Sequence, residues 1–407
     1  MLKGNAVVGQ SGGPTAAINA TLSGVIRGAK ECDAIRTLYG MRNGIEGFLD
    51  ERLIDLTEAF TQDERLFELE CTPSAALGSC RKKLPDPEKE TEIYEKLFSL
   101  FRKYDIRYFF YIGGNDSMDT VDKLSRYAVK ENWEMRFMGV PKTIDNDLFL
   151  TDHTPGFGSA AKFIATEMEE IACDCAVYTV KAVTIVEIMG RDAGWLTAAA
   201  GLPRLIGERT ADLIYLPEVP FDYNAFLDDV RAELEKKPNV VVAVSEGART
   251  ADGRYVGEGT QSGAVDTFGH KYLAGTAKEL ERLVKEKIGC KVRSVELNLP
   301  QRCASHLASA CDLEESVRVG KGAVRAAAAG VTGAIMIFER QPGTDYRVEV
   351  RPAQVCEVAN KIKAVPREGI NARGNNVTDE LLREILPLIQ GDVSVPKKNG
   401  MPLHIKL

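Results

Sequence analysis

The chain has 407 residues, of which 44% are hydrophobic and 27% charged, and its net charge is −7. These values are ordinary for a globular protein of two or three domains, and the acidic balance argues against a nucleic acid as partner, although a local cluster of cations can still hold an anion. No apolar run is long enough to cross a membrane, and the first residues lead straight into a strand pattern without a signal peptide. Nine scattered cysteines without a CxxC pair and only four histidines indicate reduced thiols in a cytoplasmic protein rather than a zinc site or a disulfide framework.

The first feature along the chain is a glycine turn. An apolar run ends at 7–9, Gly9-Gln10-Ser11-Gly12-Gly13-Pro14-Thr15 follows, and a helical pattern covers 16–29. A strand, a glycine turn and a helix start can bind phosphate, because backbone N–H groups approach the anion and the helix N-terminus adds partial positive charge. A tight turn that binds nothing is the alternative, since one glycine cluster is a weak signal.

A basic run comes next, after a strand predicted over 35–39. Small and polar residues over 72–80 lead into Arg81-Lys82-Lys83. These cations could meet an oligophosphate, but from the charges alone a solvated basic loop is the favoured interpretation. An amphipathic helix is predicted over 94–104.

The central stretch combines a second glycine turn with a reactive loop. A strand over 108–112 precedes Gly113-Gly114-Asn115-Asp116-Ser117 and a helix over 118–129, and a strand over 135–140 precedes Pro141-Lys142-Thr143-Ile144-Asp145-Asn146-Asp147. A lysine can clamp a phosphoryl group, and a carboxylate can take a proton from an attacking hydroxyl. The stretch therefore suggests phosphoryl transfer.

Alternating strands and helices continue to the C-terminus. We predict strands over 182–188, 213–216, 240–244, 292–297 and 333–338, and helices to about 173 and over 223–236, 277–287, 313–329 and 378–388. Such alternation implies parallel sheets covered on both faces. Several strands end in glycine or polar residues, and ligands of open α/β sheets bind at the carboxyl ends of strands. We therefore expect these ends to share one site.

With these motifs in place, the chain resembles the phosphofructokinases from Val7 to Arg302. The resemblance rests on the two central segments together with Met189-Gly190-Arg191 and Gln301-Arg302. It implies two doubly wound, three-layer α/β/α domains with the active site in the cleft between them. We expect a donor-binding domain over 1–157 and about 299–360, a sugar-phosphate domain over 158–298 with an insertion near 251–276, and a C-terminal extension over about 361–407.

The resemblance also implies a reaction, transfer of a phosphoryl group to the 1-hydroxyl of fructose 6-phosphate with Mg²⁺. Asp145 corresponds to the general base, and Asp116, Lys142 and Arg191 complete the expected catalytic set. The implied donor-binding residues are Gly13, Arg81, Gly114, Asn115 and Ser117, with Asn115 at the metal position. The implied substrate-binding residues are Thr143, Asp145, Asp147, Met189, Gly190, Arg191, Glu246, Arg293 and Arg302, with Arg293 acting from a neighbouring subunit of a homodimer or homotetramer.

Two positions bear on the phosphoryl donor. Members of the family that use ATP typically carry glycine at the positions of Asp116 and Lys142, whereas this chain matches the members that use pyrophosphate. A carboxylate at Asp116 would repel the α-phosphate of ATP, and Lys142 would stabilise the phosphoryl group in transfer. An alternative role for Asp116 is to cap a helix that opens at Ser117. ATP remains the alternative donor.

Departures from the family pattern leave further alternatives open. Asn115 stands where many members have a metal-binding aspartate, and a neutral amide is a weaker ligand for Mg²⁺. Ala182 and Leu299 replace residues that contact the sugar phosphate in some members, so a related acceptor such as sedoheptulose 7-phosphate is also considered. A silent sugar-phosphate-binding subunit is disfavoured by Asp145 and Arg191, and a nicotinamide-cofactor enzyme by the lack of a GxGxxG after a strand.

Overall fold

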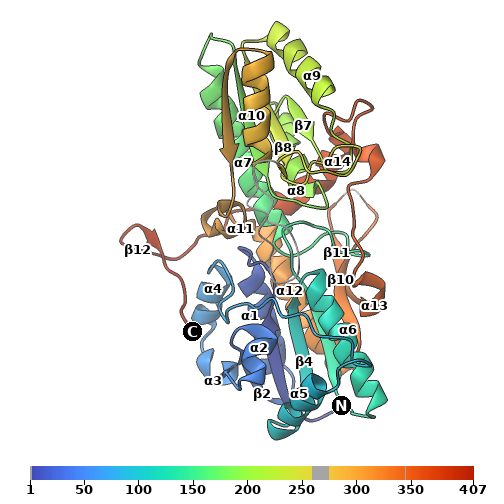
Figure 1. The fold of residues 1–407 in the computed structure, drawn as a ribbon. Helices are drawn as coiled ribbons and strands as arrows, with labels where there is room; N and C mark the ends of the chain where they lie inside the picture. The colour runs from blue at the N-terminus through green and yellow to red at the C-terminus, as the bar shows by residue number, and fades with distance from the viewer. Residues whose placement is uncertain (1, 259–274, 344) are drawn as a thin grey trace.

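Two sheets at opposite ends of the molecule organise the fold (Figure 1). The structure is a computed structural model and describes residues 2–258, 275–343 and 345–407. The lower sheet in Figure 1 has seven strands in the order β11-β10-β5-β4-β1-β2-β3: β1 (Gly4–Gln10), β2 (Ile35–Met41), β3 (Leu53–Asp55), β4 (Ile106–Gly113), β5 (Arg136–Pro141), β10 (Ala334–Arg340) and β11 (Val348–Gln354). The upper sheet has four strands in the order β7-β8-β6-β9: β6 (Ala182–Ile188), β7 (Leu213–Tyr215), β8 (Asn239–Ser245) and β9 (Lys291–Glu296).

The central strands of both sheets are parallel, as the alternating pattern predicts. The described strands of the four-stranded sheet pair in parallel throughout. In the seven-stranded sheet, however, β3 runs antiparallel to β2 and β11 antiparallel to β10, so the expected parallel pairing does not extend to these two edges. Edge strands need burial on fewer sides, and an antiparallel strand can return through a short connection.

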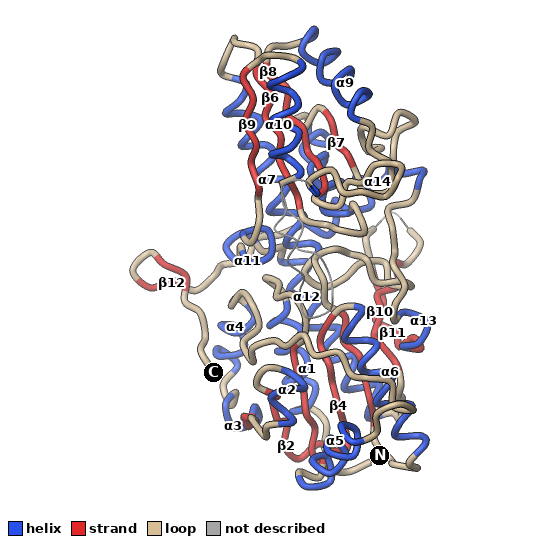
Figure 2. The backbone as a smooth tube through the Cα atoms, in the orientation of Figure 1, coloured by secondary structure: helices blue, strands red, loops and turns tan. Residues whose placement is uncertain are grey.

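Helices cover both faces of the sheets, which Figure 2 shows as blue segments around the red strands. The helices along the first half of the chain are α1 (Ile18–Lys30), α2 (Gly44–Leu49), α3 (Leu56–Ala59), α4 (Asp63–Glu70), α5 (Glu92–Lys103), α6 (Asn115–Lys130), α7 (Phe157–Ala176), α8 (Trp195–Ala198) and the 3₁₀-helix η1 (Ala199–Ile206). Those along the second half are α9 (Tyr223–Lys236), α10 (Thr276–Lys287), α11 (Pro300–Cys303), η3 (Ser305–Leu307), α12 (Ala310–Ala328), α13 (Val355–Val358), η4 (Arg367–Gly369), α14 (Asp379–Ile385) and η5 (Leu386–Ile389). None of the helices in the described part of the chain combines the length and apolar content needed to cross a membrane.

Side chains alternate between two cores in each sheet, which makes each a three-layer α/β/α arrangement. In β4, Tyr108 and Phe110 pack with α1 and α12 on one face, while Phe109 and Tyr111 pack with α5 and α6 on the other. The upper strands divide in the same way between α7 and α14 on one face and α9 and α10 on the other. The period-two alternation of a strand allows both faces to be apolar and buried. The predicted fold class is confirmed.

The C-terminal part of the chain is integrated into both halves of the molecule. From α13, beside the seven-stranded sheet, the chain crosses to α14, whose Leu381 and Leu382 are buried in the core of the four-stranded sheet (Figure 1). After a hairpin of β12 (Lys397–Lys398) and β13 (Met401–Pro402), the tail returns to the lower half, where the backbone N–H of Ile405 donates to Thr72 Oγ1 at 2.9 Å. The predicted insertion near 251–276 lies mostly outside the described residues.

Candidate functional site

The donor side of the site begins at the glycine turn after β1. Gly12 adopts a φ of 79°, a left-handed conformation that favours glycine, and its N–H donates to Cys80 O at 3.1 Å. A Cβ atom on Gly13 would lie 3.3 Å from Arg302 Nη1, and Lys142 Nζ donates to Gly13 O at 2.7 Å. Three predicted residues from distant parts of the sequence, Gly13, Lys142 and Arg302, are therefore neighbours.

Arg81 joins this group from the segment after α4. The loop before it is tied to the glycine turn, because Ser79 Oγ donates to Gly12 O at 2.6 Å. Arg81 and Arg302 both lie close enough to Lys142 to lower its pKa electrostatically. The donor side thus gathers three cations around one glycine turn, which is the charge expected of a site for a multiply charged phosphate.

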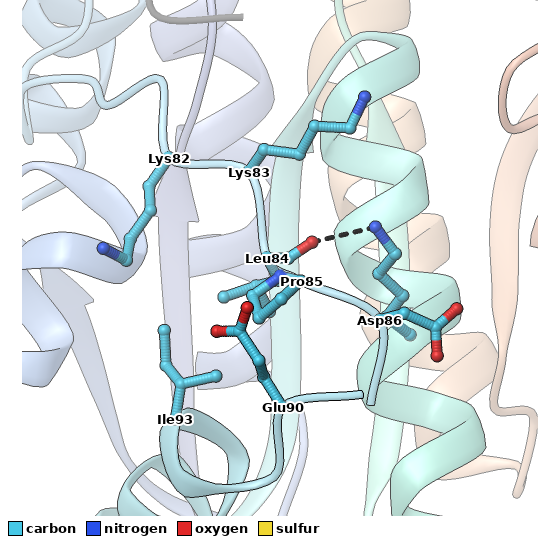
Figure 3. A pocket seen from close by; sticks show the side chains of 8 residues that line it. Lys82, Lys83, Leu84, Pro85, Asp86, Glu90 and Ile93 are labelled. Atoms are coloured by element: carbon cyan, nitrogen blue, oxygen red, sulfur yellow. Dashed lines mark hydrogen bonds between the residues drawn. The ribbon is translucent and has the colours of Figure 1, made fainter. Parts of the chain in front are cut away.

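The basic run continues from Arg81 into a pocket of about 570 Å³ that does not concentrate positive charge (Figure 3). Lys82 and Lys83 extend in different directions from the chain, and the pocket also contains the carboxylates of Asp86 and Glu90. Lys123 from α6 reaches the same wall and donates to Leu84 O at 2.9 Å. The two lysines after Arg81 are therefore not arranged to converge on one anion.

The second glycine turn places its polar residues at the start of α6. Gly114 is the N-cap residue of α6, and Asn115 and Asp116 both lie in the first helical turn. The alternative role of Asp116, capping a helix that opens at Ser117, is excluded, because the helix begins two residues earlier and has no side-chain cap. Ser117 is buried, and its Oγ would be 1.9 Å from a Cβ on Gly113, so only glycine permits this packing.

Asn115 has one free hydrogen-bonding atom. Its Nδ2 donates to Lys361 O at 3.1 Å, while its Oδ1 is buried and makes no hydrogen bond to the described residues. An unpaired buried oxygen is costly, and amide oxygens are acceptable ligands for hard cations. No three His, Cys, Asp or Glu side chains within 2–258, 275–343 and 345–407 come together as a metal site. A Mg²⁺ ion here would need phosphate oxygens and water for most of its ligands, which is its usual mode of binding.

The loop after β5 lies between the two sides of the site. The N–H of Lys142 donates to Gly113 O at 3.0 Å, and the N–H of Asp145 donates to Thr143 Oγ1 at 3.1 Å. Asn146 between the two aspartates has a φ of 54°, a left-handed conformation that Asn tolerates better than most residues. The turn therefore presents Asp145 and Asp147 next to the donor cations.

The electrostatics of this loop follow from burial of its charges. Burial lowers the pKa of Lys142 to about 8, although Asp145 and Asp147 oppose the shift. Burial also raises the pKa of Asp145, against the attraction of Arg191 and Lys142. The pKa of Asp147 is raised to about 7 by burial and by repulsion from Asp145. Carboxylates with raised pKa values beside a lysine with a lowered pKa are typical of acid–base sites.

The acceptor side is built at the carboxyl ends of β6 and β8. The N–H of Met189 donates to Gln301 Oε1 at 2.9 Å, and the N–H of Gly190, whose φ is 126°, donates to Glu246 Oε1 at 3.3 Å. Burial, followed by repulsion from Asp145, raises the pKa of Glu246 to about 8. Arg191 lies close enough to Asp145 to favour its charged form and pairs with Asp192 through Nε at 2.9 Å. The predicted residues of this side are thus brought to Asp145.

Arg293 is the predicted residue that lies apart. It stands on β9 opposite Thr184, four residues before the end of β6, and lines a small pocket with Tyr178 and Lys291. At about 3.3 Å per residue, this position is roughly 13 Å along the strand from the carboxyl end. A role for Arg293 in the site of a neighbouring subunit stays a prediction.

Several residues of the site were not assigned from the sequence. Gln301 is part of a motif to which no role was given, and Asp192 directly follows the Met189–Arg191 motif; both hold neighbouring site residues in place. Lys363, which contacts the loop after β5, belongs to a segment without any motif. Its position depends on the tertiary fold, so no local signal could have identified it.

Comparison with known proteins assigns the family. The phosphofructokinase family model matches residues 5–327, which is most of the chain. The chain belongs to the phosphofructokinase family. Among its relatives, the pyrophosphate–fructose 6-phosphate 1-phosphotransferases of Methylococcus capsulatus and Xanthomonas campestris are 41% and 42% identical to it, covering 99% and 100% of this chain and 96% and 97% of their own lengths. A solved phosphofructokinase from Nitrosospira multiformis, described as pyrophosphate-dependent, shares the fold with a TM-score of 0.89 and 37% identity, over 99% of this chain and 96% of that one.

The site of this chain joins two sets of groups. The motifs of the family coincide with the residues that the structure brings together, from Gly13 and Lys142 on one side to Arg191 and Glu246 on the other. The family assignment made from the motifs is confirmed, and it agrees with the geometry.

Proposed function

We propose that this phosphofructokinase transfers a phosphoryl group from pyrophosphate to the 1-hydroxyl of fructose 6-phosphate, forming fructose 1,6-bisphosphate and phosphate in a reversible reaction. The observation that carries the proposal is the buried Lys142, whose Nζ contacts Gly13 O at 2.7 Å between the donor cations and Asp145. The relatives that bear the name of this reaction are similar over nearly their full length, which supports the same choice of donor.

In the proposed reaction, charged residues of the site accept a proton and stabilise the transferred phosphoryl group. Asp145 takes the proton of the sugar 1-hydroxyl while the new oxygen–phosphorus bond forms, and the bridging bond of pyrophosphate breaks to release phosphate. Lys142 and Arg191 stabilise the charge that develops on the transferred group and the departing phosphate. Glu246 and Thr143 border the sugar, together with Asp147, Met189, Gly190 and Arg302.

In the proposal, pyrophosphate is bound by Gly13, Arg81, Gly114, Asn115 and Ser117. The carboxylate of Asp116 lies in the first turn of α6 without a capping role. In the proposal, a longer donor such as ATP would meet this carboxylate. When bound, Mg²⁺ would neutralise the oxygens of pyrophosphate, and Asn115 Oδ1 would hold it together with water and the donor itself. We place the donor-binding domain over 1–157 and about 299–360 and the sugar-phosphate domain over 158–298, in a cytoplasmic homo-oligomer.

A comparison of donors tests the proposal. Purified protein is incubated with fructose 6-phosphate and either pyrophosphate or ATP, and fructose 1,6-bisphosphate is measured over time. We expect turnover with pyrophosphate, little with ATP, and the reverse reaction with fructose 1,6-bisphosphate and phosphate. Turnover with ATP and none with pyrophosphate would refute the proposal, and replacing the acceptor by sedoheptulose 7-phosphate tests the choice of sugar.

A further inference from the structure

Residues 361–365, which we call the strap, lie along the catalytic loop after β5. The strap belongs to the segment in which the chain crosses from α13 to α14 (Figure 1). Ile362 forms an antiparallel bridge with Leu148, and the N–H of Lys363 donates to Asp147 O at 2.8 Å. A backbone pairing therefore fixes the strap against the end of the loop that carries Asp145 and Asp147.

The ammonium group of Lys363 makes the most specific contact of the strap. Its Nζ donates to Asn146 Oδ1 at 3.2 Å, to Thr151 O at 3.0 Å and to Asp152 O at 2.7 Å. A lysine ammonium has three N–H donors, so these three acceptors satisfy it completely. Asn146 separates the two aspartates of the loop. Lys363 therefore binds the loop at its centre, through Asn146, and at its far end, through Thr151 and Asp152.

The ends of the strap reach both sides of the site. On the donor side, Lys361 O accepts the hydrogen bond of Asn115 Nδ2 at 3.1 Å. On the acceptor side, Trp195 Nε1 donates to Lys363 O at 2.8 Å, and Glu218 Oε1 accepts from both Val365 N and Gly194 N, at 2.9 Å and 2.8 Å. Gly194 and Trp195 follow directly after the Met189–Ala193 segment, so one short stretch touches the donor residue, the catalytic loop and the acceptor segment.

We propose that Lys363 is a positioning residue for phosphoryl transfer: through the strap it holds the Asp145–Asp147 turn in register with both the donor side and the acceptor side. This inference rests on the proposed function, but it concerns a residue outside the motifs of the family. Lys363 acts through Asn146 and the backbone of the loop and has no contact with the phosphoryl group in the proposal.

Burial of the charge supports a role beyond packing. Burial lowers the pKa of Lys363 to about 8, with Asp152 and Asp147 opposing the shift and Arg340 adding to it. Burying an ammonium group is costly unless its surroundings are polar and fixed. The buried ammonium of Lys363 lies 5.0 Å from the ring centroid of Trp195 and has three oxygen acceptors, two of them backbone carbonyls, so its contacts are polar and fixed.

The expected kinetic effect is on the chemical step. In the proposal most residues that border the sugar phosphate, such as Glu246 and Arg302, lie outside the loop, whereas Asp145 must meet the attacking hydroxyl at hydrogen-bond distance. A displacement of about 1 Å at such a contact can cost roughly 100-fold in rate. Loss of Lys363 should therefore lower kcat much more than it raises KM.

The test compares Lys363→Met with the matched control Lys162→Met in the full-length protein. Lys162 also fastens the C-terminal part of the chain, since its Nζ donates to Gly391 O at 2.7 Å and to Asp392 at 2.6 Å, but it lies outside the site. Kinetics are measured with the donor that the wild type uses, and thermal melting records stability. Lys363→Gln, which keeps amide donors without the charge, serves as a second variant if the methionine variant does not fold.

We expect kcat of Lys363→Met to fall at least tenfold with KM values changed less than threefold, partial recovery in Lys363→Gln, and kcat near the wild-type value in Lys162→Met. Equal kcat in the Lys363 and Lys162 variants, at similar melting temperatures, would overturn the inference and leave Lys363 a structural residue. An increase in the KM of Lys363→Met without a loss of kcat would also overturn the inference. Absence of turnover with pyrophosphate in the wild type would instead refute the proposed function, and the Lys363 comparison would then be made with ATP.

Discussion

Replacement of Lys142 by methionine should remove most of the turnover with pyrophosphate. Lys142 is 3% exposed and donates to Gly13 O, so its charge acts in a largely water-free site. Two unit charges about 4 Å apart interact by about 4 kcal/mol at an effective dielectric constant of about 20. Because part of this interaction already acts on bound pyrophosphate, we expect kcat to fall about 100- to 1000-fold.

The pH dependence provides an independent signature of the same residue. Burial lowers the pKa of Lys142 to about 8, and only the protonated amine can stabilise the phosphoryl group. The ratio kcat/KM reports the pKa values of the free enzyme, so it should decline above about pH 8. Bound pyrophosphate should raise the pKa of Lys142, so kcat should decline only at higher pH. In Lys142→Arg the guanidinium stays charged, and the decline should move to higher pH.

The assay follows fructose 1,6-bisphosphate from pH 6 to 10 in the wild type, Lys142→Met and Lys142→Arg. Lys123→Met is the matched control, because the Lys123 side chain is only 11% exposed and pairs with Asp119 within α6. If kcat changes little in Lys123→Met, a loss of kcat in Lys142→Met is due to the missing charge at the site and not to the removal of a buried lysine in general. The reasoning is refuted if Lys142→Met keeps more than a tenth of the wild-type kcat, or if all three proteins show the same decline above pH 8.

Three further substitutions test separate features of the protein. Asp116→Gly should tighten ATP binding, measured by inhibition against pyrophosphate, because a carboxylate about 6 Å from a phosphate costs about 2–3 kcal/mol; unchanged inhibition would contradict the charge argument. Asp145→Asn should lower kcat about 100- to 10,000-fold with an unchanged melting temperature, and substantial residual turnover would exclude it as the base. Asp312→Ala should destabilise the protein by about 3–5 kcal/mol in denaturant unfolding, since the buried Asp312 accepts from Gly156 N, Ser159 N and Ser159 Oγ; a loss below 1 kcal/mol would show that the start of α7 does not depend on it.

The parts of the site that lie next to strands could be predicted from the sequence. Gly13, Asn115 and Lys142 each follow an apolar strand pattern directly, and parallel strands bring their carboxyl ends to one edge. The order of strands, glycine turns and charged residues along the chain is therefore enough to indicate which residues meet. The helix was predicted to begin at 118, three residues after its start at Asn115, and the alternative capping role considered for Asp116 depended on that later start.

Contacts between distant segments could not be predicted in this way. Lys363 and Asn146 are 217 residues apart, and nothing in the polar sequence around Lys363 distinguishes it from a surface lysine. The strand β11 was missed because it lies on an edge with only Val348 buried, and proline and arginine within it weaken the strand pattern. Contacts with other elements, and not the local sequence, determine the role of Lys363 and the formation of β11.

The position of Asp116 bears directly on how the donor is chosen. Since α6 begins at Asn115, the carboxylate of Asp116 stands at the positive end of a helix dipole, where a phosphate group would otherwise be favoured. It is joined to the lysine side of the site through the backbone, because Lys142 N donates to Gly113 O at 3.0 Å. In the proposed binding mode, pyrophosphate would end before this point, whereas the third phosphate of ATP would meet the carboxylate. We therefore propose that one anion at the helix start and one buried cation beside Gly13 select the donor by its length, without any contact to a nucleotide base.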